Sequence, residues 1–419
     1  MSETHASTTD HCEPRPYEIR IKGHLDDRWA DWFEGLAFTR ESDGTTILYG
    51  PLADQAALHG VLNGFRDLGL PIISVQCVSP NRKRSEKMKA IVYEKYGSPD
   101  VLELRDIDKP VVNDDDVLVR VRAAGTNPLD WHFMRGEPYF MRAKSGLLRP
   151  GNQRLGADFA GEVEAVGKNV TQFQPGDEVF GTQFHPGDEV FAAGDRAFAE
   201  YLCTSEDALV TKPANLTFEQ AAAVPVAALT ALRGLRDRGQ VQPGQKVLIN
   251  GASGGVGTFA VQIAKSFGAE VTAVCSTRNV DMVRSIGADR VIDYTQEDFT
   301  SGEQRYDLMF DTVGNRSLSE CRGLLVSGGT YLLVGMRTGR WLRPLPRVLA
   351  AAALSPFVSN KMVLVEVQRS KEDLLALREL LESGTVTPVI DRTYPLSEVP
   401  EAIRYLEEGH ARGKVVITV

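Results

Sequence analysis

The chain has 419 residues, of which 42% are hydrophobic and 25% are charged, as in an ordinary globular protein. These values exclude a collagen-like, a disulfide-dense and a wholly disordered chain, and the length predicts roughly one to three domains. Lys and Arg number 47 and Asp and Glu number 56, so the formal net charge is −9. Such an acidic chain lacks the basic field that favours nucleic acids, and we expect no nucleic-acid partner.

The cysteines and the apolar segments indicate the compartment. Five cysteines are scattered along the chain, and none has the C-x-x-C spacing of a zinc knuckle or a dithiol redox motif. The polar first 16 residues lack the apolar core of a secretory signal. The most apolar stretch, residues 342–354, is shorter than the ~20 residues that span a bilayer. We therefore expect a cytoplasmic protein without an integral membrane segment.

A small domain of the ferredoxin-like α+β class is predicted over residues 17–80, after a disordered segment at residues 1–16. Its apolar patterns and turn residues predict, in chain order, a strand at 17–23, a helix at 26–33, strands at 36–40 and 45–49, a helix at 54–68 and a strand at 71–78. The resulting order is β-α-β-β-α-β. The charged residues 81–87 then predict a linker.

Beyond residue 211 the apolar patterns alternate between strands and helices, which indicates a parallel, doubly wound sheet. A long Ala-rich helix is predicted at 218–236. The elements predicted after it are strands at 246–250, 270–275, 290–293, 306–311 and 330–334 and helices at 257–267 and 280–286.

A short tandem repeat precedes this region. The segment QFQPGDEVFGT at residues 172–182 is followed by QFHPGDEVFAA at residues 183–193, a period of 11 residues. Two copies are too few for a solenoid. We interpret the repeat as a local duplication that lengthens one hairpin.

A glycine-rich turn after the strand at 246–250 is the strongest functional motif. The turn consists of Ala252, Ser253, Gly254, Gly255, Val256 and Gly257, which gives the dinucleotide fingerprint A-x-G-x-x-G. Small residues are needed because the turn is tight, the backbone approaches a pyrophosphate and the helix packs close to the strand. The helix N-terminus adds N–H groups and a positive dipole end. The strand–turn–helix context favours a dinucleotide site over a glycine-rich turn without a ligand.

The end of the next strand indicates which dinucleotide is bound. About 20 residues after the turn, an Asp or Glu would bind the ribose 2′-hydroxyl of NAD, but this chain has Ser276, Thr277 and Arg278 there. Hydroxyl and guanidinium donors suit a 2′-phosphate, so NADPH is the expected cofactor. The alternative is that Arg278 is only a solvated residue at the start of a helix.

Seven segments of residues 88–419 carry a family resemblance. They are AAGTNPLD (123–130), GADFAGEVEAVG (156–167), PGDEVFG (175–181), AAAVPVAALTAL (221–232), GASGGVG (251–257), GADRVIDY (287–294) and GKVVI (413–417). In their order and spacing they resemble the medium-chain dehydrogenase/reductase superfamily, most closely its zinc-independent, quinone oxidoreductase (zeta-crystallin-like) branch. The resemblance does not extend to residues 1–87.

The resemblance implies two domains with an active site between them. A GroES-like, β-rich catalytic domain would comprise residues 88–211 and 368–419, and a Rossmann NADP-binding domain at residues 212–367 would be inserted into it. Zinc enzymes of the superfamily carry a Cys ligand and a Gly-His-Glu segment, where this chain has Gly125-Thr126-Asn127 and Gly156-Ala157-Asp158. A catalytic zinc needs about three protein ligands, so we expect no metal site.

Asn127, Asp130 and Tyr139 are the candidate catalytic residues. The resemblance places Asn127 near the nicotinamide, where its amide can donate to the cofactor or to the substrate oxygen, and Asp130 can orient Asn127 or a water. The structural alternative is that Asn-Pro-Leu-Asp forms a turn. Related enoyl reductases use a tyrosine near the position of Tyr139 as a proton donor, whereas we favour packing as the role of this side chain.

Further cofactor contacts are implied by the resemblance alone. Thr230, Val313, Gly335 and Met336 would lie near the nicotinamide or its ribose, and Tyr294 would lie near the adenosine. Thr230 is equally explained as a β-branched packing residue within a helix.

The function that these observations favour is that of an NADPH-dependent reductase, which acts without zinc on a quinone or a related electrophilic carbonyl compound. The substrate would be small and hydrophobic, and the apolar residues 342–354 would cover the sheet, line the substrate site or form a dimer surface. One alternative is reduction of the activated C=C bond of an enone or enoyl thioester. Another is an NADPH-binding redox sensor or scaffold with weak catalysis, in which residues 17–80 bind a protein partner. We expect a homodimer.

Overall fold

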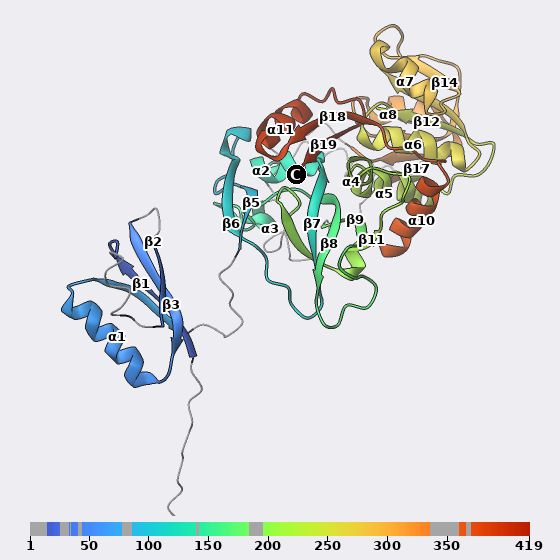
Figure 1. The fold of residues 1–419 in the computed structure, drawn as a ribbon. Coiled ribbons are helices and arrows are strands. Elements are labelled where there is room, and N and C mark those ends of the chain that lie inside the picture. The colour runs from blue at the N-terminus through green and yellow to red at the C-terminus, as the bar shows by residue number, and fades with distance from the viewer. Residues whose placement is uncertain are drawn as a thin grey trace, which may run out of the picture. The chain divides into compact units, whose positions relative to one another are not determined.

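The computed structural model describes residues 15–25, 33, 35–40, 44–77, 86–139, 142–183, 196–335, 360–365 and 370–419. The chain divides into two compact units, Met1–Glu86 and Lys87–Val419 (Figure 1). The role of Met336, the role of residues 342–354 and the second copy of the repeat apart from Gln183 fall outside the described residues. The same holds for most of the disordered segment predicted at 1–16 and of the linker predicted at 81–87.

The first unit contains an antiparallel sheet of four strands. Its described elements are β1 (Arg15–Lys22), β2 (Ala37–Arg40), β3 (Thr45–Leu52), α1 (Gln55–Asp67) and β4 (Ile72–Cys77). The strand order is β2-β3-β1-β4, and every neighbouring pair is antiparallel, which is compatible with a ferredoxin-like sheet. Most of the helix predicted at 26–33 lies outside the described residues, so the ferredoxin-like class stays a prediction. β1 begins at Arg15, so its first two residues overlap the segment predicted to be disordered.

The core of the first unit lies between the sheet and α1. Alternate residues of β1, namely Tyr17, Ile19 and Ile21, are buried, as the two-residue period of a strand requires. Phe65 of α1 stacks on Phe33, with 4.7 Å between the ring centroids. The apolar face of α1 thus covers one face of the sheet.

The first sheet of the second unit is mixed. Its strands are β7 (Asp116–Gly125), β8 (Asp158–Val166), β9 (Glu178–Thr182), β10 (Tyr201–Ser205), β11 (Leu209–Thr211), β18 (Ile390–Pro395) and β19 (Lys414–Thr418). They are ordered β11-β9-β8-β7-β19-β18, and β10 also pairs with β7. The pairing of β19 with β7 joins the C-terminal segment to the start of the unit. A separate hairpin consists of β5 (Lys87–Val92), which begins at the last residue of the predicted linker, and β6 (Glu103–Asp108).

The second sheet is parallel and doubly wound. Its described strands are β12 (Lys246–Asn250), β13 (Glu270–Cys275), β14 (Arg290–Asp293), β15 (Tyr306–Asp311), β16 (Leu325–Leu333) and β17 (Lys361–Leu364). The order β14-β13-β12-β15-β16-β17 is the Rossmann order, in which the strand order reverses between β12 and β15 while all strands stay parallel. Ligands of such sheets bind in the crevice outside the carboxyl ends of these two strands.

The helices of the second unit cover both sheets (Figure 1). They are α2 (Pro128–Arg135), α3 (Arg142–Ser145), α4 (Phe218–Ala222), α5 (Pro225–Arg233), α6 (Gly255–Ser266), α7 (Val280–Ser285), α8 (Leu318–Gly323), α10 (Lys371–Glu382) and α11 (Val399–Glu407), with short 3-10 helices η2 (Pro99–Val101), η5 (Glu206–Ala208), η7 (Thr277–Asn279) and η9 (Leu396–Glu398). Among the described residues, none of the helices has the length and hydrophobicity needed to span a membrane.

The prediction of one long helix at 218–236 is wrong. The segment forms α4, then α5, and then a π-helical turn η6 (Gly234–Arg238). Pro225 is the first residue of α5. Proline has no N–H group, and its ring clashes with the carbonyl of the residue four positions earlier, so it kinks or breaks a helix and is favoured at the first turn of a new one. The apolar period continues across the break because both helices pack on the same core.

Candidate functional site

The turn between β12 and α6 requires glycine at two positions for internal reasons. Gly251 has a φ of +83°, and a Cβ atom on it would lie 2.2 Å from the Thr312 Oγ1 atom. A Cβ atom on Gly257 would lie 2.1 Å from the carbonyl oxygen of Gly251. These contacts bring α6 close to the loop after β15 and fix the direction in which the helix begins.

Gly254 is a glycine for another reason. The nearest atom to a Cβ on Gly254 is the Gly251 oxygen at 3.5 Å, an ordinary contact, so the packing of the chain tolerates a side chain here. Gly254 is the N-cap of α6, and residues 253–256 are half-buried. The N–H groups and the positive end of α6 point toward this bare backbone, which is the arrangement that a pyrophosphate needs. Ala252, in contrast, is fully buried and faces the core.

The residues after β13 meet those after β12 through an asparagine. The Asn279 Nδ2 atom donates to the Ser253 Oγ atom at 3.0 Å and to the Ser276 Oγ atom at 3.2 Å. Asn279 itself is buried, and its Oδ1 atom has no hydrogen-bond partner in the structure. The predicted residues Ser253 and Ser276 are therefore held on the same side of the loop.

Thr277 and Arg278 are exposed and make contacts that the sequence analysis did not foresee. The Thr277 hydroxyl donates to the Asp293 carboxylate, at the end of β14. The Arg278 Nη2 atom donates to the His410 carbonyl at 2.6 Å, and Arg412 Nη2 donates back to the Arg278 carbonyl at 3.3 Å. The predicted Tyr294 follows Asp293 directly and has an exposed fraction of 54%. The surface beyond β13 and β14 therefore presents the guanidinium groups of Arg278 and Arg412 and the carboxylate of Asp293.

The loop at the switch point is built around Asp311, a fully buried residue at the end of β15. Its Oδ1 atom accepts from the backbone N–H of Val313 at 3.0 Å and of Gly314 at 2.9 Å, and from Asn250 Nδ2 at 2.9 Å. Its Oδ2 atom accepts from the Tyr331 hydroxyl at 2.8 Å. One carboxylate thus holds the loop that carries the predicted residue Val313.

The predicted Gly335 lies against the same loop. A Cβ atom there would lie 2.1 Å from the Thr312 carbonyl oxygen, and the Gly335 N–H donates to the Asp311 carbonyl at 3.2 Å. Gly335 is therefore required by the close approach of two loops. The predicted Thr230 is buried in α5, and its hydroxyl donates to the Val226 carbonyl one turn earlier at 2.6 Å, which supports the packing alternative.

A buried polar network surrounds Asn127, which has an exposed fraction of 2%. Its Nδ2 atom donates to the Asp158 Oδ2 atom at 2.9 Å, and its Oδ1 atom accepts from the Lys414 ammonium at 2.7 Å. The ammonium also donates to the Thr126 carbonyl at 2.6 Å and lies 3.9 Å from Asp158. The Asp158 carboxylate in turn accepts from the Val226 N–H, at 3.1 Å to its closer oxygen. Segments from β8, β19 and the start of α2 therefore meet at one amide, and α5 joins them through Asp158.

Asp130 completes this network. One of its oxygens accepts from the Asn127 N–H at 2.7 Å and the other from the Gly156 N–H at 3.1 Å. Burial raises the pKa of Asp130 to about 7, against the opposing effect of these N–H donors. Burial likewise raises the pKa of Asp158 and lowers the pKa of Lys414. Two carboxyl groups and one ammonium share a space from which water is excluded.

The network adjoins the glycine-rich turn. Gly254 and Gly413 form an isolated β-bridge, and Lys414 follows Gly413. A Cβ atom on Gly255 would lie 3.0 Å from the Cδ atom of Lys414. The aliphatic part of Lys414 thus passes beneath the turn, and its ammonium ends at Asn127.

Comparisons with known proteins agree with this architecture. Residues 113–214 match the family model of the alcohol dehydrogenase GroES-like domain, and residues 286–417 match that of zinc-binding dehydrogenases. NAD(P)H oxidoreductase RTN4IP1, mitochondrial, from Mus musculus is 34% identical and covers 82% of this chain and 92% of its own length. The 2-methylene-furan-3-one reductase of Solanum lycopersicum is 37% identical and covers 79% of each chain. A solved quinone oxidoreductase from Coxiella burnetii superposes with a TM-score of 0.68 at 32% identity, covering 80% of this chain and 100% of its own.

The chain belongs to the medium-chain dehydrogenase/reductase superfamily, in its quinone oxidoreductase branch. It is therefore an oxidoreductase, and the predicted combination of a GroES-like domain with a Rossmann sheet is confirmed. Residues 16–76 match a separate family model, described only as a domain of unknown function (DUF8691). The RTN4IP1 relative is named mitochondrial, so the cytoplasmic location stays a prediction.

At the positions of the zinc ligands of this superfamily, the side chains contact one another. Asn127 and Asp158 are hydrogen-bonded together, and the Lys414 ammonium lies against both. An ammonium at this position would repel a dication, and Ala157 offers no donor atom. Within the described ranges, no three His, Cys, Asp or Glu side chains cluster closely enough to hold a metal ion. The donor set does not fit a catalytic zinc.

Tyr139 lies in a different environment from the Asn127 network. The Arg142 guanidinium lies 4.7 Å from the centroid of the Tyr139 ring and 4.4 Å from that of Tyr96. The ring thus packs on a cation. Whether Tyr139 serves in packing or in proton donation stays a prediction.

Lys414, Asp158 and Asp311 are the residues of the site whose roles the sequence analysis missed. Lys414 stands at the start of the apolar run KVVI, and Asp311 ends the apolar strand that begins at Tyr306. A charged residue inside or directly after a fully buried strand is a signal that a buried partner exists, since such residues are rarely buried alone. That signal was present in the sequence, but it does not name the partner.

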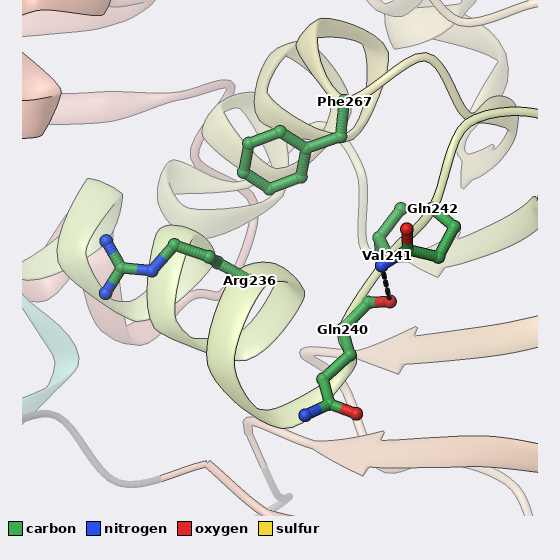
Figure 2. A pocket seen from close by; sticks show the side chains of 5 residues that line it. All are labelled: Arg236, Gln240, Val241, Gln242 and Phe267. Atoms are coloured by element: carbon green, nitrogen blue, oxygen red, sulfur yellow. Dashed lines mark hydrogen bonds between the residues drawn. The ribbon is translucent and has the colours of Figure 1, made fainter.

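A surface hollow of about 380 Å³ lies elsewhere on the Rossmann domain (Figure 2). It is lined by Arg236, Gln240, Val241, Gln242 and Phe267. Four of these residues precede β12, whose other end carries the glycine-rich turn. β12 has five residues and spans roughly 16 Å at about 3.3 Å per residue, so the hollow and the turn lie at opposite ends of this strand. The hollow is not part of the dinucleotide site.

Proposed function

We propose that the chain is an NADPH-dependent reductase of quinones that acts without a metal ion. The observation that carries the proposal is Gly254, a glycine that internal packing does not require, at the N-terminus of α6 and at the switch point of a Rossmann sheet. Bare backbone at this place leaves room for a pyrophosphate. The named activities of the relatives, NAD(P)H and quinone oxidoreduction, support the same conclusion.

The residues along the crevice fit a dinucleotide. Residues 253–257 would hold the pyrophosphate, Ser276, Thr277 and Arg278 the 2′-phosphate, and the Val313 loop the nicotinamide ribose. The guanidinium of Arg278 is exposed, so it can leave the His410 carbonyl and pair with a phosphate, for which the gain is larger. The Asp293 carboxylate, which accepts a hydrogen bond from Thr277, opposes a 2′-phosphate. The preference for NADPH over NADH therefore depends on Arg278.

The side chains near the nicotinamide would position the cofactor and the substrate rather than supply a proton. When bound, NADPH supplies a hydride, so that a quinone and one proton become a hydroquinone. The Asn127 amide is fixed by Lys414 and Asp158, and one of its two N–H bonds is used by Asp158. The second N–H can donate to the cofactor amide or to the substrate oxygen. A quinone needs little acid catalysis because its reduced anion is stabilised by resonance, which suits a site built on an amide.

Reduction of the C=C bond of an enone is the second candidate activity. The relative from Solanum lycopersicum is named a 2-methylene-furan-3-one reductase, and such a substrate is an enone. Parallel assays of NADPH oxidation with a panel of quinones and a panel of enones distinguish the two. A preference of about tenfold or more in kcat/KM for either panel decides between them.

A cofactor titration tests the proposal directly. Arg278→Ala is expected to weaken NADPH binding by roughly 1–3 kcal/mol and to leave NADH binding unchanged, because only NADPH carries the 2′-phosphate. Arg284→Ala is the matched control, since Arg284 is an exposed arginine on the adjoining helix α7. Equal losses for both nucleotides would contradict the assignment. Tight NADPH binding with no turnover on either panel would instead favour a sensor or scaffold.

The assembly stays a prediction. A homodimer is expected from the sequence, and a protein partner for residues 17–80 belongs to the sensor or scaffold alternative. Light scattering of the full chain at several concentrations tests the homodimer. A constant monomer mass across the micromolar range would contradict it.

A further inference from the structure

We propose that Lys414 is a positioning residue of the active site, which holds the Asn127 amide in one orientation and links it to the dinucleotide-binding turn. This inference rests on the proposed function, because it assigns a role to Asn127 beside the nicotinamide. In the protein without cofactor, the orientation of the buried Asn127 amide would likewise depend on the buried Lys414 ammonium.

The orientation follows from the hydrogen-bonding capacity of the partners. An ammonium can only donate and an ionised carboxylate can only accept. Lys414 lies 2.7 Å from the side-chain oxygen of Asn127, and Asp158 lies 2.9 Å from its side-chain nitrogen. Rotating the amide by 180° would place donor against donor at Lys414 and acceptor against acceptor at Asp158. Only one orientation therefore satisfies both charged partners.

The charge of Lys414 is needed in this space. Asp158 is fully buried, and the ammonium at 3.9 Å is the cation that faces it. Asp130 also raises the pKa of Lys414, which opposes the effect of burial. Without the ammonium, the Asn127 oxygen and the Thr126 carbonyl would lose their shared donor and the Asp158 charge would remain uncompensated. The amide would then be free to turn its oxygen toward other donors.

The link to the dinucleotide-binding turn is mechanical. The Cδ atom of Lys414 lies directly beneath Gly255, and Gly413 pairs with Gly254 through a β-bridge. The aliphatic part of the side chain therefore contacts the element that would hold the pyrophosphate, while its ammonium contacts Asn127. A displacement of the turn would therefore reach the amide through the Lys414 side chain. Neither contact requires Lys414 to touch the substrate.

The test is Lys414→Met, which keeps an unbranched apolar side chain and removes the ammonium. We expect kcat for quinone reduction to fall about 100-fold, as on loss of a fixed polar group in an active site. The Kd for NADPH and the KM for quinone should change less than about threefold, because the contact with the turn is apolar and is retained. Lys212→Met is the matched control, since Lys212 is a second buried lysine, bonded to the Pro213 and Leu216 carbonyls.

A double-mutant cycle separates positioning from a general structural effect. If Lys414 acts through Asn127, then Asn127→Ala and the combined Asn127→Ala, Lys414→Met variant have the same kcat. Additive losses would overturn the proposal. Where Lys414→Met folds poorly, the additional change Asp158→Asn removes the uncompensated charge. That pair of changes should restore the far-UV circular dichroism spectrum and NADPH binding but not kcat, and recovery of kcat would also overturn the proposal.

A readout without turnover distinguishes failure of this inference from failure of the proposed function. In the full chain labelled with 15N-asparagine, the side-chain NH2 signals of Asn127 are assigned by their loss in Asn127→Ala. Lys414→Met should shift these signals and accelerate their exchange with water, whereas Lys212→Met should leave them unchanged. If the wild type lacks reductase activity but the shift occurs, the proposed function fails and the positioning role survives. Unchanged signals in Lys414→Met would refute the role of Lys414 whatever the activity.

Discussion

A Cβ atom on Gly257 would lie 2.1 Å from the carbonyl oxygen of Gly251, across the turn that joins β12 to α6. Because the clash is with backbone, Gly257→Ala must displace α6 from the sheet. We expect the free energy of unfolding to fall by about 1–3 kcal/mol, measured by urea denaturation, with a parallel loss of NADPH affinity. Gly323→Ala is the control, because a Cβ atom there meets nothing within 4 Å. Equal stability of the two variants would contradict this account of the turn.

Gly254→Ala should separate packing from ligand binding. The added Cβ meets only the Gly251 oxygen at 3.5 Å, so the free energy of unfolding should change by less than about 0.5 kcal/mol. NADPH affinity should fall at least about tenfold, because the methyl group occupies the path of the pyrophosphate. Isothermal titration of the wild type and the variant measures the effect. Unchanged affinity would show that the pyrophosphate lies elsewhere.

The Rossmann sheet was predictable because its signals are local. The bounds predicted for 246–250, 270–275, 290–293 and 306–311 are those of β12 to β15, since each strand is a short apolar run between polar turns. The glycine-rich turn was recognisable for the same reason, as its strand, turn and helix are adjacent in the sequence. Pro225 is an equally local signal, because proline favours the first turn of a helix over its interior. The long helix predicted through Pro225 neglects this rule.

The Asn127 network could not be predicted because its partners are distant in sequence. Asn127 and Lys414 are 287 residues apart, and Asn127 and Asp158 are 31 apart. Only the pairing of β19 with β7 brings the C-terminal segment beside the start of α2. Sequence patterns report which face of a strand is buried, but not which strand becomes its neighbour. A polar network between sheet neighbours therefore appears only once the topology is known.

Asp311 should tolerate Asn but not Ala. In Asp311→Asn, the amide oxygen can still accept from the Val313 and Gly314 N–H groups, and the amide nitrogen can donate to the Tyr331 hydroxyl, which is able to accept. We expect Asp311→Asn to lower the free energy of unfolding by less than about 1.5 kcal/mol and Asp311→Ala by at least about 3 kcal/mol, because Ala leaves several buried donors unpaired. Urea denaturation of both variants tests this. Similar losses would mean that the charge of Asp311, rather than its hydrogen bonds, holds the loop.

The buried carboxyl of Asp130 should make the stability of the protein fall as the pH rises toward neutrality. Its pKa is raised from 3.8 to about 7 in the folded chain, chiefly by burial, so between these values the folded form keeps a proton that the unfolded form releases. Unfolding then releases a proton, and this group lowers the free energy of unfolding by up to about 1.4 kcal/mol per pH unit. Its contribution is complete below pH 4 and is lost by about pH 7.

Exposed carboxylates whose pKa is lowered, such as Asp289, act in the opposite direction. The informative quantity is therefore the difference in the free energy of unfolding between wild type and Asp130→Asn, which cannot ionise. That difference should grow in favour of the variant from pH 4 to pH 7 and then level off. A difference independent of pH would mean that Asp130 is ionised throughout and that its two N–H donors outweigh the effect of burial.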